Sequence, residues 1–269
     1  CHCEKEPEKV ASGIDRLLIV EPEFMKKSRL FTPGPTPVPP SVLQRSAEPI
    51  IHHRTPEFKS SLANVHADLA YLFATEQPVM VFSSSGTGAM EAALAGTMSL
   101  EDRIVAVNGG KFGGRWGEIG RSWGLDVDEI DVEWGDPVDI NMLRQHVAAG
   151  ATRAVCLTHS ETSTGTFTDV KATTAALRAD GFDGLVIVDG ITAVGAHEML
   201  FDEWDLDVVV TGSQKGLMIP PGLSCIALSD RAWRAVERSN LPGLYFDLAT
   251  ARTAHAKDAT PWTPAVTLV

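Results

Sequence analysis

Three polar stretches with the potential for chemistry each follow an apolar segment of the chain. Lys215 lies in VVVTGSQKGLMIPPG, residues 208–222, where a strongly hydrated lysine either reaches water at a sheet edge or serves as a nucleophile. Asp189 ends LVIVD, where a buried carboxylate needs a cation or donor to remain ionised, or else caps the next helix. The turn SSSGTG, residues 83–88, could bind an anion or merely begin a helix.

Strand-like and helical patterns alternate along the chain and would position these groups. The strand-like segments are PVMVF, RIVAV, RAVCLTH, GLVIVDG, LDVVVTG and LSCIALS, and helical patterns such as GTGAMEAALAGTM, RWGEIGRSWG and DVKATTAALRADG lie between several of them. This alternation predicts an α/β fold with mainly parallel strands and crossover helices. Ligands bind at the carboxyl ends of the strands in such sheets, so we expect the three polar stretches to face one cavity.

An anion cradle, an acid and a lysine at neighbouring strand ends are the groups that pyridoxal 5'-phosphate requires. In VFSSSGTGAMEAAL, a strand, a Ser/Gly turn and a helix direct backbone N–H groups and the positive helix end toward one point. The turn lacks the Lys-Ser/Thr pair of a P-loop and the full dinucleotide glycine pattern, which weakens a nucleotide interpretation. Asp189 would protonate the cofactor's ring nitrogen and Lys215 would form the Schiff base.

Composition and charge exclude several classes of protein. The chain has 269 residues, of which 44% are hydrophobic, enough for one large domain or two modest ones. Its 23 Lys and Arg against 35 Asp and Glu give a formal net charge of −12, which argues against nucleic acid or an anionic membrane as partner. The apolar runs are far shorter than the roughly 20 residues of a membrane span.

The cysteines indicate a reducing environment. Cys156 and Cys225 lie in apolar, strand-like runs and are predicted to be buried. The N-terminal triplet Cys1-His2-Cys3 has no second half-site later in the chain, so we predict no metal centre. Cysteines this sparse fit a cytoplasmic protein.

The first residues differ in character from the rest. Residues 1–24 are charged and lack a signal-peptide core, and Met25 has the appearance of a natural start. We therefore expect residues 1–24 to be a leader or upstream segment outside the core. Residues 25–269 are predicted to form a cofactor-binding large domain with an N-terminal arm.

A series of motifs from about Leu30 onward resembles the class V aminotransferases, a family of fold-type I pyridoxal-phosphate enzymes. The likeness is nearest to the alanine–glyoxylate and serine–glyoxylate aminotransferases. That subgroup also includes proteins described as small subunits of soluble hydrogenases, which would imply a binding partner instead of a reaction. The motifs occur in the order TPGPTPVPPSVL, HHRTPEF, SSSGTGAMEA, NGGKFGGRW, THSETSTG, VDGITAVGA, GSQKGLMIPPG and TPWTPAV.

The resemblance implies roles for individual residues. Lys215 would hold the cofactor aldehyde and move a proton between substrate and cofactor carbons, and Asp189 would pair with the pyridinium nitrogen. An aromatic side chain after a strand can also be plain core, which is the alternative for Phe112. The other implied contacts are Ser85, Gly86 and Thr87 to the phosphate, assisted by Ser213 and Gln214, with Phe112 on the ring face and Thr162 near the ring hydroxyl.

The family's quaternary structure and C-terminal region raise further expectations. Its members are homodimers with shared active sites, and Thr263 matches a threonine that reaches the partner's phosphate. A tyrosine that relatives place before this motif has no counterpart in KDATPWTPAV. The family continues past the position of Val269 into a small domain whose arginine grips the substrate carboxylate, so we expect a fragment truncated before that domain. Arg54 and Arg115 are alternative carboxylate ligands.

The implied reaction is a transamination from a small amino acid, such as alanine or serine, to glyoxylate or another 2-oxo acid. A lyase or desulfurase of the same fold is one alternative, but a desulfurase needs a mobile catalytic cysteine, whereas Cys156 and Cys225 lie in strand-like runs. A catalytically silent, hydrogenase-associated subunit is another. Asp189 and Lys215 argue against it, because an idle site has no reason to retain a buried charged pair.

Overall fold

A computed structural model of the chain describes residues 30–269. The predicted leader over residues 1–24 and the triplet Cys1-His2-Cys3 lie outside the described residues. Residues Phe31–Val269 form one unit. Within the described residues, no helix has the length and apolar character needed to span a membrane. The same residues contain no group of three or more His, Cys, Asp or Glu side chains arranged to hold a metal ion.

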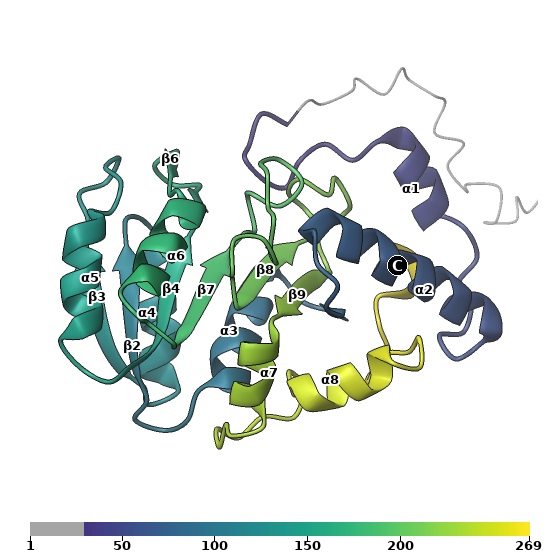
Figure 1. The fold of residues 1–269 in the computed structure, drawn as a ribbon. Coiled ribbons are helices and arrows are strands. Elements are labelled where there is room, and N and C mark those ends of the chain that lie inside the picture. Colours follow the sequence, from purple (N-terminus) through teal and green to yellow (C-terminus); the bar gives the residue numbers. More distant parts are fainter. Residues whose placement is uncertain (1–29) are drawn as a thin grey trace, which may run out of the picture. The chain divides into compact units, whose positions relative to one another are not determined.

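A seven-stranded sheet in the order β1-β9-β8-β7-β4-β2-β3 runs through this unit (Figure 1). All neighbouring strands pair in parallel except at β9, which is antiparallel to both β8 and β1. The predicted α/β class with a mainly parallel sheet is confirmed. The strands are β1 Val79–Phe82, β2 Arg103–Asn108, β3 Asp126–Asp131, β4 Thr152–Thr158, β7 Leu185–Asp189, β8 Val208–Gly212 and β9 Ser224–Leu228.

Two strands depart from the pattern expected of the sequence. The link from β8 to β9 covers only residues 213–223 and contains no helix, so β9 departs from the mainly parallel pattern and returns antiparallel beside β8. β3 was not predicted, because its sequence DVDEID is rich in acidic residues. β3 is an edge strand that pairs only with β2, and an edge position tolerates charged side chains.

Helices cover both faces of the sheet. Residues from α3, α4, α7 and α8 pack on one face, and residues from α2 and α6 pack on the other, with Leu143 of α5. A small hairpin, β5 Ser160–Glu161 with β6 Thr166–Phe167, follows β4. The helices are α1 Pro40–Ser46, α2 Pro56–Phe73, α3 Gly86–Thr97, α4 Gly113–Ser122, α5 Ile140–Ala148, α6 Val170–Ala179, α7 Asp230–Val236 and α8 Leu248–His255, with a 3-10 turn at Val266–Leu268.

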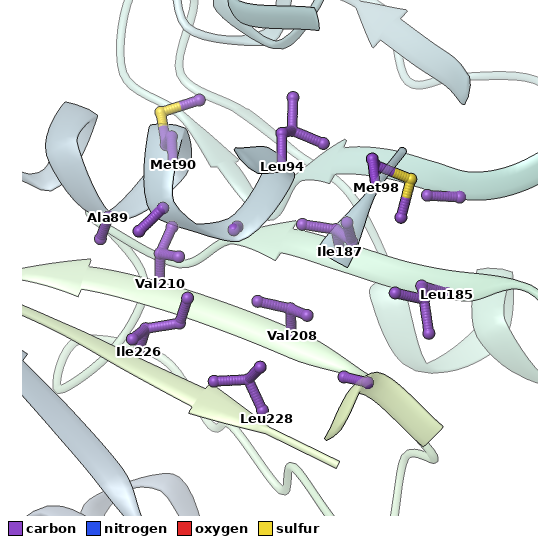
Figure 2. Packing of buried hydrophobic residues seen from close by; sticks show 14 of the residues in the cluster. Ala89, Met90, Leu94, Met98, Leu185, Ile187, Val208, Val210, Ile226 and Leu228 are labelled. Carbon is purple, nitrogen blue, oxygen red and sulfur yellow. The ribbon is translucent and has the colours of Figure 1, made fainter. Parts of the chain in front are cut away.

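Alternation along the strands builds the two halves of the core. In β7, Leu185 and Ile187 belong to the cluster around α3, whereas Val186 and Val188 belong to the cluster on the opposite face, as the two-residue period of a strand requires. This packing fixes α3 against the central strands, so its N-terminus lies at their carboxyl ends. Figure 2 shows Ala89, Met90, Leu94 and Met98 of α3 packed over Leu185, Ile187, Val208, Val210, Ile226 and Leu228.

Candidate active site

A cavity of about 280 Å³ lies where the carboxyl ends of β7 and β8 approach the N-terminus of α3. All of the predicted site residues line it except Ser213 and Thr263. The convergence expected from the strand ends is therefore present. The cavity's position follows from the topology, because parallel strands and the helices between them direct their connecting turns to one edge.

Lys215 lies in the loop between β8 and β9, and its side chain is only 8% exposed. Burial lowers the pKa of its ammonium group, and the negative charge of Asp189 opposes that shift. A lysine with a lowered pKa supplies a neutral amine, the form that acts as a nucleophile. The sheet-edge interpretation therefore does not hold for Lys215.

The N-terminal arm, the described segment that precedes α1, packs on the loop that holds this lysine. Thr36 donates its backbone N–H to the Gln214 carbonyl at 3.0 Å and its hydroxyl to the Lys215 carbonyl at 3.0 Å. Gly34 lies against the Lys215 side chain so closely that a Cβ atom there would overlap it. Glycine at position 34 thus permits the arm to pack on the lysine.

Asp189 is 4% exposed at the end of β7, and one carboxylate oxygen accepts the Ile191 N–H at 2.8 Å. Burial raises the pKa of this carboxyl from 3.8 to about 7, despite the opposing effect of the Ile191 hydrogen bond. No lysine, arginine or histidine within residues 30–269 forms an ion pair with it. Asp189 was alternatively expected to cap a following helix, but within residues 30–269 a turn and no helix directly follows β7, and the Ile191 N–H contact lies in that turn.

The N-terminus of α3 is open to the cavity. Ser85 is its N-cap residue, yet the Ser85 side chain makes no capping hydrogen bond. The backbone N–H groups of Ser85, Gly86 and Thr87 have no acceptor in the described part of the chain. Gln214 also lines the cavity, and its side-chain carbonyl oxygen is buried without a hydrogen bond. Unpaired N–H groups at a helix N-terminus favour an anion.

Phe112 and Arg115 enter the cavity from the start of α4. Phe112 is the N-cap residue of α4, and the Nζ atom of Lys215 lies 5.9 Å from the centre of its ring. The Arg115 guanidinium carbon lies 4.9 Å from the same centre. Arg115 also donates to the Thr87 hydroxyl at 2.9 Å, which links the starts of α4 and α3.

Glu161 is a buried residue that sequence reasoning missed. Its carboxylate is 4% exposed and accepts hydrogen bonds from the backbone N–H groups of Phe112 and Gly113 at 3.1 and 2.8 Å. It also accepts from the backbone and hydroxyl of Ser163. Glu161 thus caps α4 and positions Phe112. The available signal was an acidic residue within THSETSTG, close to the glycines of NGGKFGGRW, since a Cβ on Gly110 would overlap Glu161.

The remaining predicted residues differ in their placement. Thr162 lines the cavity and its hydroxyl shares a hydrogen bond of 2.6 Å with Thr192, another cavity residue that we did not predict. The Ser213 hydroxyl instead donates to the Pro220 carbonyl and accepts the Leu223 N–H, so it stabilises the loop behind the cavity. Thr263 is exposed and lies outside the cavity lining.

The sequence of the chain matches the family profile described as Aminotransferase class-V over residues 29–264. The chain belongs to the class V aminotransferase family. The resemblance expected from the motifs is therefore confirmed, and the fold agrees with it.

Individual relatives carry different names. The chain is 44% identical over 246 residues to the "Soluble hydrogenase 42 kDa subunit" of Anabaena cylindrica, covering 90% of this chain and 64% of that protein. It is 36% identical over 244 residues to the L-aspartate–glyoxylate aminotransferase of Paracoccus denitrificans, covering 89% and 62%. The structure of an aspartate aminotransferase of subgroup IV from Thermus thermophilus matches with a TM-score of 0.84 and 35% identity, covering 90% and 67%. The chain spans slightly less than two thirds of the length of these two curated relatives.

Class V aminotransferases and their fold-type I neighbours depend on pyridoxal 5'-phosphate. The cavity residues fit this cofactor on three independent observations. Asp189 is a buried carboxylate without a cation, and a protonated ring nitrogen supplies one. The amides at the start of α3 are donors without acceptors, and a phosphate supplies acceptors. Lys215 is a buried amine with a lowered pKa, and an aldehyde is its natural reaction partner.

Proposed function

We propose that the chain is the cofactor-binding part of an aminotransferase that uses pyridoxal 5'-phosphate. The observation that supports this most strongly is a buried lysine and a buried, unpaired aspartate on the wall of one cavity. Keeping both groups out of water without an ion pair is costly for folding, so a ligand that uses both explains why they are there. Family membership supports the same reaction class.

Each residue has a distinct task in this proposal. The cofactor, when bound, supplies an aldehyde that combines with amines and a ring that withdraws electrons from the adjacent carbon. Lys215 would hold the cofactor aldehyde through its Nζ atom, and the same amine would carry a proton between the substrate and cofactor carbons. Asp189, ionised beside a cationic ring nitrogen, keeps that nitrogen protonated. Phe112 would bound the ring face and Thr162 would lie near the ring hydroxyl.

The remaining predicted site residues are proposed to contact the phosphate, either within the same chain or from a partner subunit. The amides of Ser85, Gly86 and Thr87 bind the phosphate in this proposal, and Gln214 assists them from beside Lys215. Ser213 is not among the proposed phosphate ligands, because its hydroxyl donates one hydrogen bond and accepts another within the loop. Thr263 is exposed, which suits a contact with the phosphate site of a second copy in a homodimer.

The proposed substrates are a small amino acid, such as alanine or serine, and glyoxylate or another 2-oxo acid. The likeness to relatives named serine–glyoxylate aminotransferase, such as that of Methylorubrum extorquens at 32% identity, supports a small donor. Glyoxylate is the acceptor in the name of the Paracoccus denitrificans relative. A cytoplasmic location is part of the proposal, supported by the free cysteines Cys156 and Cys225.

The decisive experiment replaces the lysine. Borohydride reduction should attach the cofactor covalently to the purified chain, and this attached cofactor serves as the label. We expect the label on the peptide that contains Lys215, and we expect Lys215→Ala to lose it. Lys257→Ala, which changes a lysine outside the cavity, is the matched control and should keep the label. Label on another lysine in the Lys215→Ala variant would refute the assignment. Activity is then assayed with alanine, serine and aspartate against glyoxylate.

The hydrogenase name of the Anabaena cylindrica relative supports one alternative, a catalytically silent subunit. In that case the chain would hold no borohydride-trappable cofactor and would show no amino transfer. A desulfurase is poorly supported, because Cys156 and Cys225 are buried in β4 and β9. Burial raises the pKa of both thiols, that of Cys225 to about 12, which disfavours the reactive thiolate.

A further inference from the structure

Within the described residues 30–269, Arg115 is the one basic residue of the cavity lining besides Lys215. Its helix and two side-chain contacts hold it in place. It lies in the first turn of α4, whose N-terminus is fixed by Glu161. Its guanidinium lies against the Phe112 ring, and one nitrogen donates to the Thr87 hydroxyl at 2.9 Å. The planar cation is therefore preorganised at the edge of the cavity, which reduces the entropy lost on binding.

Most of the hydrogen-bonding capacity of Arg115 is unused. A guanidinium has five N–H donors, and within residues 30–269 only the contact with Thr87 uses one. No Asp or Glu among those residues forms an ion pair with Arg115. A half-buried arginine with free donors facing a cavity calls for an anion.

The contact with Thr87 indicates where this anion lies. Because the Thr87 hydroxyl accepts a hydrogen bond from Arg115, its own proton is directed away from Arg115, and that proton has no acceptor in the described chain. Beside it are the free N–H groups of Ser85, Gly86 and Thr87. Donors from two helices thus meet at the start of α3. An acceptor for all of them needs several oxygens and a negative charge.

We propose that Arg115 binds the phosphate monoester of the cofactor rather than the carboxylate of the substrate. This inference rests on the proposed function. A phosphate monoester carries a charge of about −1.5 to −2, whereas a helix N-terminus offers only about +0.5. Arg115 supplies the missing positive charge and holds the Thr87 hydroxyl as a donor to the same group. It therefore has both a binding and a positioning role.

The test compares ligands with and without phosphate. The probes are pyridoxal 5'-phosphate, pyridoxal and inorganic phosphate, titrated into the wild-type chain and into Arg115→Gln and Arg115→Lys. We expect Arg115→Gln to weaken binding of pyridoxal 5'-phosphate roughly 10- to 100-fold, the loss of one charged hydrogen-bonding partner, and to leave pyridoxal binding unchanged. Arg115→Lys should recover part of the loss, because it restores the charge without the planar fork.

A second arginine of α4 provides the matched control. Arg121 pairs with Glu129 and does not line the cavity, so Arg121→Gln should leave the affinities for all three probes unchanged. Circular dichroism of each variant verifies that α4 is retained. Equal weakening of pyridoxal and pyridoxal 5'-phosphate in Arg115→Gln would overturn the inference, since it would show an effect through the Phe112 ring.

Two further outcomes separate this inference from the proposed function. Unchanged cofactor affinity in Arg115→Gln, together with a higher KM for the amino donor, would assign Arg115 to the substrate carboxylate and overturn the inference alone. If the wild-type chain bound inorganic phosphate but formed no adduct with the cofactor, the proposed function would fail. Loss of phosphate binding in Arg115→Gln would then still support the anion site. A wild-type chain that binds neither pyridoxal 5'-phosphate nor inorganic phosphate would refute both the inference and the proposed function.

Discussion

Two buried aspartates, one at the carboxyl end of a strand and one at the amino end of the neighbouring parallel strand, differ in their hydrogen-bond partners. Asp189 ends β7, and Asp207 directly precedes β8. From the part of the chain that the structure describes, Asp189 accepts a single hydrogen bond, from the Ile191 N–H. Asp207 is fully buried and has four partners: the side chains of Arg178, Arg231 and Ser229, and the backbone N–H of Val186.

The difference separates a structural carboxylate from one that is available for chemistry. Around Asp207, two arginines and two further donors compensate for the loss of water, as a stable buried charge requires. Around Asp189 that compensation is missing, and burial raises the pKa of its carboxyl to about 7. The number of partners, more than burial itself, therefore marks the candidate site.

The largest expected effect is on stability, in a matched pair of isosteric variants. Asp207→Asn should lower the free energy of unfolding by about 2–3 kcal/mol, because it removes the buried charge shared by Arg178 and Arg231 and leaves them only the exposed carboxylate of Asp205 as a counter-charge. Asp189→Asn should cause no loss at about pH 8, because it removes an uncompensated buried charge. Urea denaturation of the chain without added cofactor measures both. A similar loss in the two variants would break the comparison.

A smaller effect is expected in the pH dependence of stability. The folded state holds the Asp189 proton up to about pH 7, whereas the unfolded chain releases it near 3.8. The folded state thus binds more protons between these values, so the contribution of Asp189 to stability falls as the pH rises from about 4 to about 7.

Asp189→Asn removes this pH dependence. The variant should become progressively more stable than the wild type across the same interval, with the difference greatest at its upper end. Denaturation curves at a series of pH values measure the difference, in which titration of the other groups cancels. A constant difference between the two proteins would show that the pKa of Asp189 is not raised.

The smallest expected effect concerns two helix N-termini. The Asp169 side chain accepts the Ala172 N–H at the start of α6, and Asp169→Ala should destabilise the chain by about 1 kcal/mol. The Ser85 side chain caps nothing at the start of α3, so Ser85→Ala should leave stability nearly unchanged. Thermal denaturation compares the two. A loss for Ser85→Ala as large as that for Asp169→Ala would contradict an open, ligand-binding terminus.

The sequence predicted the elements whose patterns are local. The valine-rich run before Lys215 and the turn before Gly86 mark strand ends without any knowledge of their neighbours. The direction of β9 could not be read in this way, because it depends on a connection without a helix. The strand Asp126–Asp131 was not predicted, because its charged side chains fit an edge position that only the complete sheet defines.

Sequence reasoning picked out candidate site residues that are unusual in type for their surroundings, and it missed residues that matter through their contacts. Lys215 and Asp189 are unusual in apolar surroundings, so the sequence alone draws attention to them. Glu161 becomes significant only because it reaches the first amides of α4, which lie far away in the sequence. Ser213 looked like a phosphate ligand beside Lys215, but its hydroxyl is used by the loop.

The contacts of Thr36 also bear on the order in which the chain folds. Its hydroxyl reaches the Lys215 carbonyl across 179 positions of sequence, so this contact closes one of the longest loops available to the chain. During synthesis, the segment around Gly34 and Thr36 leaves the ribosome long before the residues it contacts exist. We therefore expect this segment to dock only after the β8–β9 connection that carries Lys215 has formed.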